Sequence, residues 1–292
     1  MVNLDNECVK YPLLISICLI CSATSAKTPA YEDFKLLASD GASGERFGHS
    51  VSISGNGTTA LVGAYGDDAN GTNSGSAYVY RLVLGVWQEA KLLASDGVSD
   101  DDFGKSVSIS GDGTTAIVGA AFDQDNGASS GSVYIYRLVL GVWQETKLIA
   151  SDGASGDNFG IRVSLSGDGT AAIVGAWGDN DNGSFSGSAY IYELVGGVWE
   201  ETKLLASDGA SDDDFGKSVS ISSYGSTAIV GAHGDDDNGS YSGSAYIFDI
   251  DGPDCPDING DGYVNVTDLL VVIDQWGLTN SPADLNDDGI VD

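Results

Sequence analysis

Apolar and small polar residues alternate along most of this chain, in short segments separated by glycine-rich turns. Residues 50–54 alternate strictly, the Gly-Asn-Gly sequence at 55–57 provides turn chemistry, and residues 60–62 run apolar into Gly63. A period of two is typical of β-strands, and Gly and Asn tolerate the positive φ of tight hairpin turns. The pattern predicts an antiparallel hairpin.

Two further strands follow the hairpin. An acidic loop at residues 67–71 ends in an Asn-Gly turn signal, and it leads into the apolar segments 77–80 and 87–93. Strand-like runs bounded by such turns are typical of antiparallel sheets. We therefore expect one sheet of four short strands.

This four-strand pattern repeats with a fixed period. The Phe-Gly pair at Phe47 recurs at Phe103, Phe159 and Phe215, and each step is 56 residues. A four-stranded sheet cannot bury both of its faces alone, so consecutive units must stack. Radial stacking of such sheets produces a propeller. The sequence thus predicts an all-β fold: a four-bladed β-propeller of four 56-residue, four-stranded repeats over residues 31–250.

The two ends of the array suggest how it closes. Residues 31–39 align with the fourth-strand segments that begin at Trp87, Trp143 and Trp199, whereas the last unit lacks this segment. The N-terminal strand is therefore expected to complete the last blade and close the ring, which would also cover exposed strand edges. An open array of four units is the alternative.

The repeated residues resemble a known family. Phe-Gly at the start of each unit and Gly-Ala at the end of its second strand are similar to FG-GAP repeats, the units of the integrin α-subunit propeller. The resemblance covers residues 31–250 and implies a propeller used in extracellular recognition or adhesion. Integrin-type propellers often hold calcium in their loops, but here only Asp68 and Asn70 stand at ligand-like positions. Turns capped by Asx side chains are the alternative to calcium sites.

The charge of the chain restricts its partners. Forty-three acidic residues against 12 basic ones give a formal net charge of −31. Such a surface repels phosphate backbones, so nucleic acid is not an expected partner.

The first 26 residues form a separate segment. Residues 13–21 are apolar or small, and residues 22–26 offer a small-residue cleavage site. These features predict a signal peptide at 1–26, a short linker at 27–30 and a secreted or cell-surface protein, although Asp5 and Glu7 depart from the usual positive start. An apolar N-terminal arm is the alternative. The run is too short to span a bilayer, so no transmembrane segment is expected in the mature chain.

A calcium-binding motif follows a linker at 251–256. It places oxygen donors at loop positions 1, 3, 5, 9 and 12, a glycine at position 6, and a backbone carbonyl at position 7. The expected ligands are Asp257, Asn259, Asp261, Tyr263 (through its carbonyl), Asn265 and Asp268. Ca²⁺ takes six to eight oxygens, and a twelve-residue loop bent at Gly262 supplies them. An acidic turn without metal, before a helix, is the alternative.

The rest of the tail at 257–292 extends this motif. Residues 269–276 are expected to form a short amphipathic helix, and an incomplete second loop offers Asp284, Asn286 and Asp288. Loop, helix and second loop resemble a type I dockerin that is truncated in its second half. The resemblance implies a calcium-dependent docking partner of the cohesin type.

No set of residues predicts catalysis. The acidic clusters at 100–102 and 212–214 occupy equivalent positions of repeated units, so we expect solvated turns rather than the acid/base pair of a glycosidase. His49 and His233 lie at different positions of different units, without an evident nucleophile. We therefore expect a binding protein, not an enzyme.

Positions at which the repeats differ are the best guides to recognition. After the Gly-Ala step stand Tyr65, Trp177 and His233, and the following loops contain Phe185 and Tyr241. In a propeller these positions ring one face, where aromatic side chains could stack on a glycan or contact an extracellular protein; drift of tolerant loop residues is the alternative. The expected function is a secreted adhesion or binding propeller with a calcium-dependent docking tail. The second interpretation is an accessory or docked component of an extracellular polysaccharide-degrading system.

Overall fold

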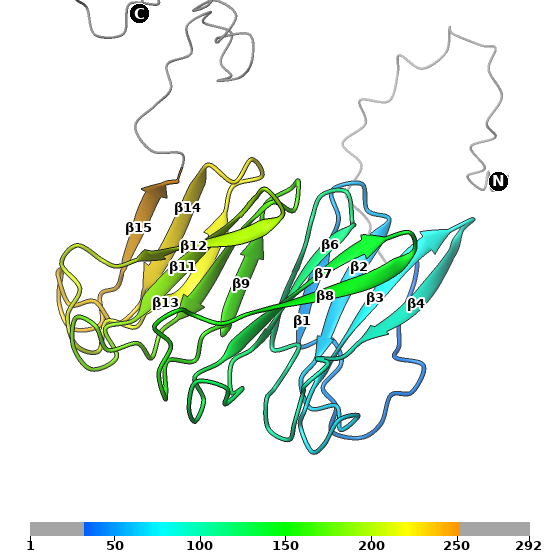
Figure 1. The fold of residues 1–292 in the computed structure, drawn as a ribbon, viewed down its shortest axis with the longest axis horizontal. Helices are drawn as coiled ribbons and strands as arrows, with labels where there is room; N and C mark the ends of the chain where they lie inside the picture. Colours follow the sequence, from blue (N-terminus) through cyan, green and yellow to red (C-terminus); the bar gives the residue numbers. More distant parts are fainter. Residues whose placement is uncertain (1–31, 251–292) are drawn as a thin grey trace, which may run out of the picture. The chain divides into compact units, whose positions relative to one another are not determined.

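The computed structural model describes residues 32–250, and every regular element in that range is a β-strand (Figure 1). The chain divides into two compact units between Leu37 and Ala38, and residues 32–37 belong to the first of them. The predicted signal peptide, both linkers, the calcium loops and the tail helix lie outside the described residues.

Within the described range the strands form four antiparallel sheets, one for each repeat. The first sheet contains β1 (Ser50–Ile53), β2 (Thr59–Ala64), β3 (Ser76–Val83) and β4 (Val86–Leu92). The second contains β5 (Ser106–Ile109), β6 (Thr115–Ala120), β7 (Ser132–Val139) and β8 (Val142–Leu148). The third contains β9 (Arg162–Leu165), β10 (Ala171–Ala176), β11 (Ser188–Val195) and β12 (Val198–Leu204). The fourth contains β13 (Phe215–Ile221), β14 (Thr227–Ala232) and β15 (Ser244–Asp249).

The strands are joined in the order of the chain, and their register repeats from sheet to sheet. In the first sheet β1 pairs with β2, β2 with β3, and β3 with β4, which confirms the predicted four-strand unit. The last hairpin closes at the pair Val83↔Val86 through Leu84 and Gly85, whose φ angles are +51° and +82°. Positive φ at both turn residues is the geometry of a type I′ hairpin.

The core lies between the sheets. We call rear face the side of a sheet that packs on the next sheet along the chain, and front face the opposite side. At the first junction the rear face contributes Leu61, Val79, Leu92 and Ala94, and the front face contributes Phe103, Val107, Ile109, Val118 and Tyr134. Equivalent residues fill the second and third junctions. Burying one such Leu or Phe stabilises the fold by about 2 kcal/mol, and a lone sheet would lose this contribution.

Glycines allow neighbouring sheets to approach closely at one end. Gly131 forms an isolated parallel bridge with Phe159, and the Phe159 amide donates to the Ser130 carbonyl at 3.0 Å. A Cβ on Gly131 would stand 2.1 Å from the Phe159 carbonyl oxygen, and φ there is +87°. No other residue could replace this glycine without moving the sheets apart. The same bridge joins Gly75 to Phe103 and Gly187 to Phe215.

The fourth sheet has three strands, as expected for the last repeat. Residues 32–39 are assigned to no strand, so closure of a ring by the N-terminal segment stays a prediction. The structure establishes four successive propeller-type sheets that pack rear face to front face.

Candidate functional site

A buried acidic cluster lies beside the outer strand of the third sheet. The ammonium of Lys203 on β12 donates to Asp152 at 2.6 Å, Asp179 at 2.8 Å and Asp181 at 2.6 Å. The hydroxyl of Tyr190 on β11 donates to Asp152 at 2.8 Å and Asp179 at 3.2 Å. Three loops and two strands thus meet at one lysine, which neutralises carboxylates that repel one another.

The same cluster recurs one repeat earlier and again in the first sheet. Lys147 donates to Asp96, Asp123 and Asp125 at 2.7–3.0 Å, and Lys91 donates to Asp40 and Asp67 at 2.7 Å. In the first sheet Ala69 stands where the third carboxylate would be. We call each of these a Lys–Asp cluster. Recurrence in three sheets indicates a structural element of the repeat.

The electrostatics of the clusters are mutual. Burial by itself would lower the pKa of the Lys203 ammonium, but its bonds to three carboxylates raise this pKa above the ordinary value. Burial would likewise raise the pKa of Asp152, yet the hydrogen bonds from Lys203 and Tyr190 lower it. The charged forms of both partners are therefore favoured at neutral pH.

These carboxylates also have the spacing of a metal site. One oxygen each of Asp152, Asp179 and Asp181 lies within 4.8 Å of the others. The Lys203 ammonium is bonded to all three, so a cation at this place would have to displace it.

The two loop positions considered for calcium make local bonds instead. Asp68 accepts from the Asn73 amide at 2.8 Å, and the Asn70 side chain donates to the Ala94 carbonyl at 3.0 Å. These are the contacts of Asx-capped turns.

Aromatic and cationic side chains meet in the loops at one end of the sheets. Trp177 stacks on Phe185 with ring centroids 5.6 Å apart and an interplanar angle of 19°. Lys217, from the fourth sheet, places its ammonium 3.4 Å from the centroid of the Trp177 ring. This distance fits a cation–π contact.

Tyr65 occupies the equivalent position in the first sheet and makes similar contacts. Its ring is 4.5 Å from that of His49, edge to face, and its hydroxyl accepts from Arg46 at 2.5 Å. Lys105, from the second sheet, lies 5.1 Å from the Tyr65 centroid and 4.1 Å from that of Phe122. In both places a lysine of one sheet covers an aromatic ring of the preceding sheet.

The other predicted binding residues are more exposed. The Nδ1 atom of His233 is 3.2 Å from an Asp214 oxygen, and Tyr241 holds its backbone amide 2.6 Å from an Asp236 oxygen. Phe185 and Tyr241 both have a φ of +54°. Bulky side chains are uncommon in this left-handed region, and such strain is frequent at functional sites.

We call the five predicted residues Tyr65, Trp177, Phe185, His233 and Tyr241 the aromatic face. The structure brings Trp177 and Phe185 together, whereas Tyr65 and His233 belong to the equivalent places in other sheets. Sequence reasoning missed the cations Arg46, Lys105 and Lys217. Comparing the repeats at these polar positions, where Asp102, Ile161 and Asp214 also occur, would have drawn attention to them.

The cations create a positive region in an acidic protein. Burial lowers the pKa of His49, and the charges of Lys105, Arg162 and Arg46 lower it further. Since Arg162 comes from the third sheet, these groups gather from three repeats. Such a region attracts anions at short range.

The acidic clusters at 100–102 and 212–214 are not simply solvated turns, so that expectation was wrong. Asp101 and Asp213 are buried and accept from the backbone amides of Val98 and Ala210 at 2.7 Å. Burial, with repulsion from Asp123, raises the pKa of Asp101 to about 6. Asp102 pairs with Lys105 at 2.6 Å. The carboxylates therefore fix loop geometry in equivalent places.

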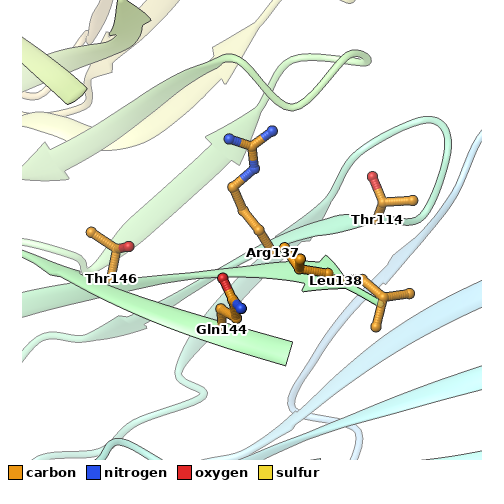
Figure 2. Close-up of a pocket in the computed structure, with 6 residues that line it drawn as sticks. Thr114, Arg137, Leu138, Gln144 and Thr146 are labelled. Atoms are coloured by element: carbon orange, nitrogen blue, oxygen red, sulfur yellow. The ribbon is translucent and has the colours of Figure 1, made fainter. Parts of the chain in front are cut away.

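A small hollow lies on the outer side of the second sheet (Figure 2). Its volume is about 200 Å³, and it is lined by Thr114, Arg137, Leu138, Val139, Gln144 and Thr146. Arg137 is the one charged side chain in this lining, so the hollow lacks the convergent polar groups typical of a ligand pocket.

Comparison with family models decides the family. The model for the FG-GAP repeat matches four segments, at residues 31–80, 86–136, 143–192 and 199–248. The chain belongs to the FG-GAP repeat family. Each match begins with the outer-strand segment that precedes a repeat, which agrees with the predicted repeat boundaries and with the observed sheets.

Solved structures similar to these FG-GAP repeats have low sequence identity. Hydrazine synthase of Kuenenia stuttgartiensis is 16% identical with a TM-score of 0.46, over 76% of this chain and 50% of that one. A putative TolB of Agrobacterium tumefaciens is 15% identical (TM-score 0.44; 72% and 60%), and the periplasmic gluconolactonase PpgL of Pseudomonas aeruginosa is 15% identical (0.44; 70% and 54%). The chain thus spans 50–60% of their length.

Comparison with curated proteins gives no match. Within residues 32–250 the FG-GAP repeats contain no helix with the length and apolarity needed to cross a membrane.

Replacing Lys203 by Met should destabilise the third sheet by about 2 kcal/mol, because Asp179 would be left buried without its cation. The loss should shrink below about pH 4. The pKa of Asp152 is lowered in the folded state, so the stability that the cluster contributes is present above the unfolded pKa and is lost as the carboxylates become protonated. Urea unfolding at pH 7 and pH 3.5 measures both effects. Lys217→Met, which breaks a more exposed pair, is the control and should cost less than about 1 kcal/mol.

Asp101→Asn should change how stability depends on pH. The folded-state pKa of Asp101 is about 6, above the unfolded value, so wild-type stability falls at this site as pH rises from 4 to 7.5. The variant lacks this fall, and its stability relative to wild type should rise by about 2 kcal/mol over that range. Asp112→Asn is a control of opposite sign, since hydrogen bonds from Ser110 and Thr114 outweigh burial and lower the pKa of Asp112. Parallel pH profiles for Asp101→Asn and wild type would contradict the assignment.

Proposed function

We propose that this chain is a secreted, non-catalytic recognition protein, in which the FG-GAP sheets bind an extracellular ligand and the tail docks in a calcium-dependent way. The observation that carries the proposal is the pairing of aromatic rings with lysines at one end of the sheets. Trp177 with Phe185 and Lys217 is the most developed of these sites.

The geometry of the aromatic face supports a ligand rather than a packing role. Phe185 and Tyr241 are exposed and have positive φ, where other repeats use Asn73 and Ser129. Smaller, polar residues adopt this conformation at lower cost, so packing gives no reason for the aromatic rings. A ligand that contacts the rings supplies one.

The chemistry favours a glycan with acidic groups. Exposed aromatic rings can stack on the apolar faces of sugars, and Arg46, Lys105 and Lys217 can bind carboxylate or sulfate groups beside them. An extracellular protein with an acidic surface is the other ligand considered.

The tail proposal rests on sequence spacing. Asp257, Asn259, Asp261, Asn265 and Asp268 offer side-chain oxygens, and Tyr263 offers its carbonyl, in the order that a twelve-residue calcium loop needs. Calcium bound there would fix the loop against the helix expected at 269–276, and a cohesin-like partner would recognise that surface. The second candidate function, a docked component of a polysaccharide-degrading system, is favoured by this feature alone.

Replacing both Trp177 and Tyr241 by Ala should weaken glycan binding at least tenfold, since aromatic anchors usually dominate such contacts. Titration calorimetry with polygalacturonate, as an acidic polysaccharide, and laminarin, as a neutral one, measures the affinity, with stronger binding expected for the former. Leu140→Ala, at a fully exposed hairpin tip of the outer strands, is the matched control. Unchanged affinity in the double variant would remove the aromatic face. Release of reducing sugar from either polysaccharide, with or without calcium, would contradict a non-catalytic role.

Asp261→Ala should abolish calcium binding at the tail, because it removes the carboxylate at loop position 5. Titration of the full chain with CaCl₂ alone should give one transition in the wild type that is absent from the variant. Asp168→Ala, in a turn of the third sheet, is the control and should leave that transition in place. A wild-type chain that gives no calcium-dependent signal would refute the tail site without affecting the aromatic face.

A further inference from the structure

The two terminal sheets expose the faces that interior sheets bury. On the front face of the first sheet, Val51 is 69% exposed and Ile53 63%, whereas Val107 in the second sheet is 8% exposed. On the rear face of the fourth sheet, Ile247 is 73% exposed and Ile229 44%, whereas Ile191 in the third sheet is 1% exposed. These faces are the two halves of the same type of junction, and neither half is covered.

The fourth sheet also has an acidic cluster without its lysine. The Tyr246 hydroxyl donates to Asp208 and Asp235 at 2.9 Å, as the equivalent Tyr190 does in the third sheet. Within residues 32–250, however, no lysine or arginine pairs with Asp208, Asp235 or Asp237. Repulsion from Asp235 and Asp208 raises the pKa of Asp237, which agrees with a missing cation.

The chain carries the missing parts in its N-terminal segment. In steps of 56 residues, Lys35 aligns with Lys91, Lys147 and Lys203. In the same register Leu36 and Ala38 align with Leu92 and Ala94, which complete the rear face of the first sheet. Residues 31–38 therefore match, position by position, the outer strand that the fourth sheet lacks.

The stacking geometry indicates where this segment binds. All three junctions repeat one backbone bond: Gly55 donates to Gly111, Gly111 to Gly167, and Gly167 to Ser223. Four sheets related in this uniform way leave the first and last faces exposed to solvent. A further junction of the same kind then requires a face from outside the chain.

We propose that a second copy of this chain covers each exposed face, so that the front face of sheet one and residues 31–38 of one copy pack on the rear face of sheet four of another. In this arrangement Lys35 enters the acidic cluster of Asp208, Asp235 and Asp237 across the junction. Two copies joined in this way at both ends leave neither face uncovered. The contact is head-to-tail, because the two surfaces that meet are different.

Engineered disulfides test the pairing directly. In the first sheet Arg81 on β3 lies opposite Gln88 on β4, and the equivalent pair at the proposed junction is Asp249 with Glu32. In the full chain with its four native cysteines replaced by serine, Glu32→Cys with Asp249→Cys should give a covalent dimer on oxidation. The matched control, Arg81→Cys with Gln88→Cys, should cross-link within one chain and run as a monomer.

A mixing experiment tests the head-to-tail arrangement. Val51→Asp spoils the front face and Ile247→Asp spoils the rear face, so each variant alone should be monomeric by light scattering, with the circular dichroism of the wild type. An equimolar mixture should form a dimer, because the intact rear face of one variant can meet the intact front face of the other. Leu84→Asp, at an exposed turn, should leave the wild-type assembly unchanged.

Two results would overturn the proposal. One is a wild-type chain that is monomeric at 10 µM or more, and the other is a disulfide between Glu32→Cys and Asp249→Cys that forms within a single chain. The latter would mean that the chain covers its own faces. Neither result bears on glycan binding by the aromatic face.

Discussion

Burial of the rear face of each sheet against the front face of the next is the interaction on which the rest of the structure depends. A single sheet of four short strands exposes apolar residues on both sides, so it gains most of its stability from its neighbours. Phe103, Phe159 and Phe215 are fully buried at the three junctions, and glycines at the sheet ends permit the close approach. Each repeat therefore folds as part of an array.

The charged groups of the repeat follow from this stacking. Every junction brings carboxylates from two loops next to the outer strand, where one lysine neutralises them. A protein with a net charge of −31 can thus keep buried acids without large repulsion. The cost of leaving such a cluster incomplete is what makes the fourth sheet informative.

Recognition is carried by the departures from the repeat. Backbone conformation is the same at the four loop positions 73, 129, 185 and 241, all with positive φ, but the side chains change from Asn and Ser to Phe and Tyr. A scaffold fixed by packing leaves such loop residues free to vary without loss of the fold. The aromatic face thus combines a rigid frame with variable contacts.

The sequence by itself determined the strands, the 56-residue period and the stacking of sheets, because alternation and turn residues act locally and recur four times. It also placed Trp177 and Phe185 at related positions. Only the tertiary structure decided that Asp152, Asp179 and Asp181 converge on Lys203, that Asp101 is buried, and that Lys217 covers Trp177. These contacts join residues from different loops or different repeats, and their distances depend on the angle between sheets, which no local pattern encodes.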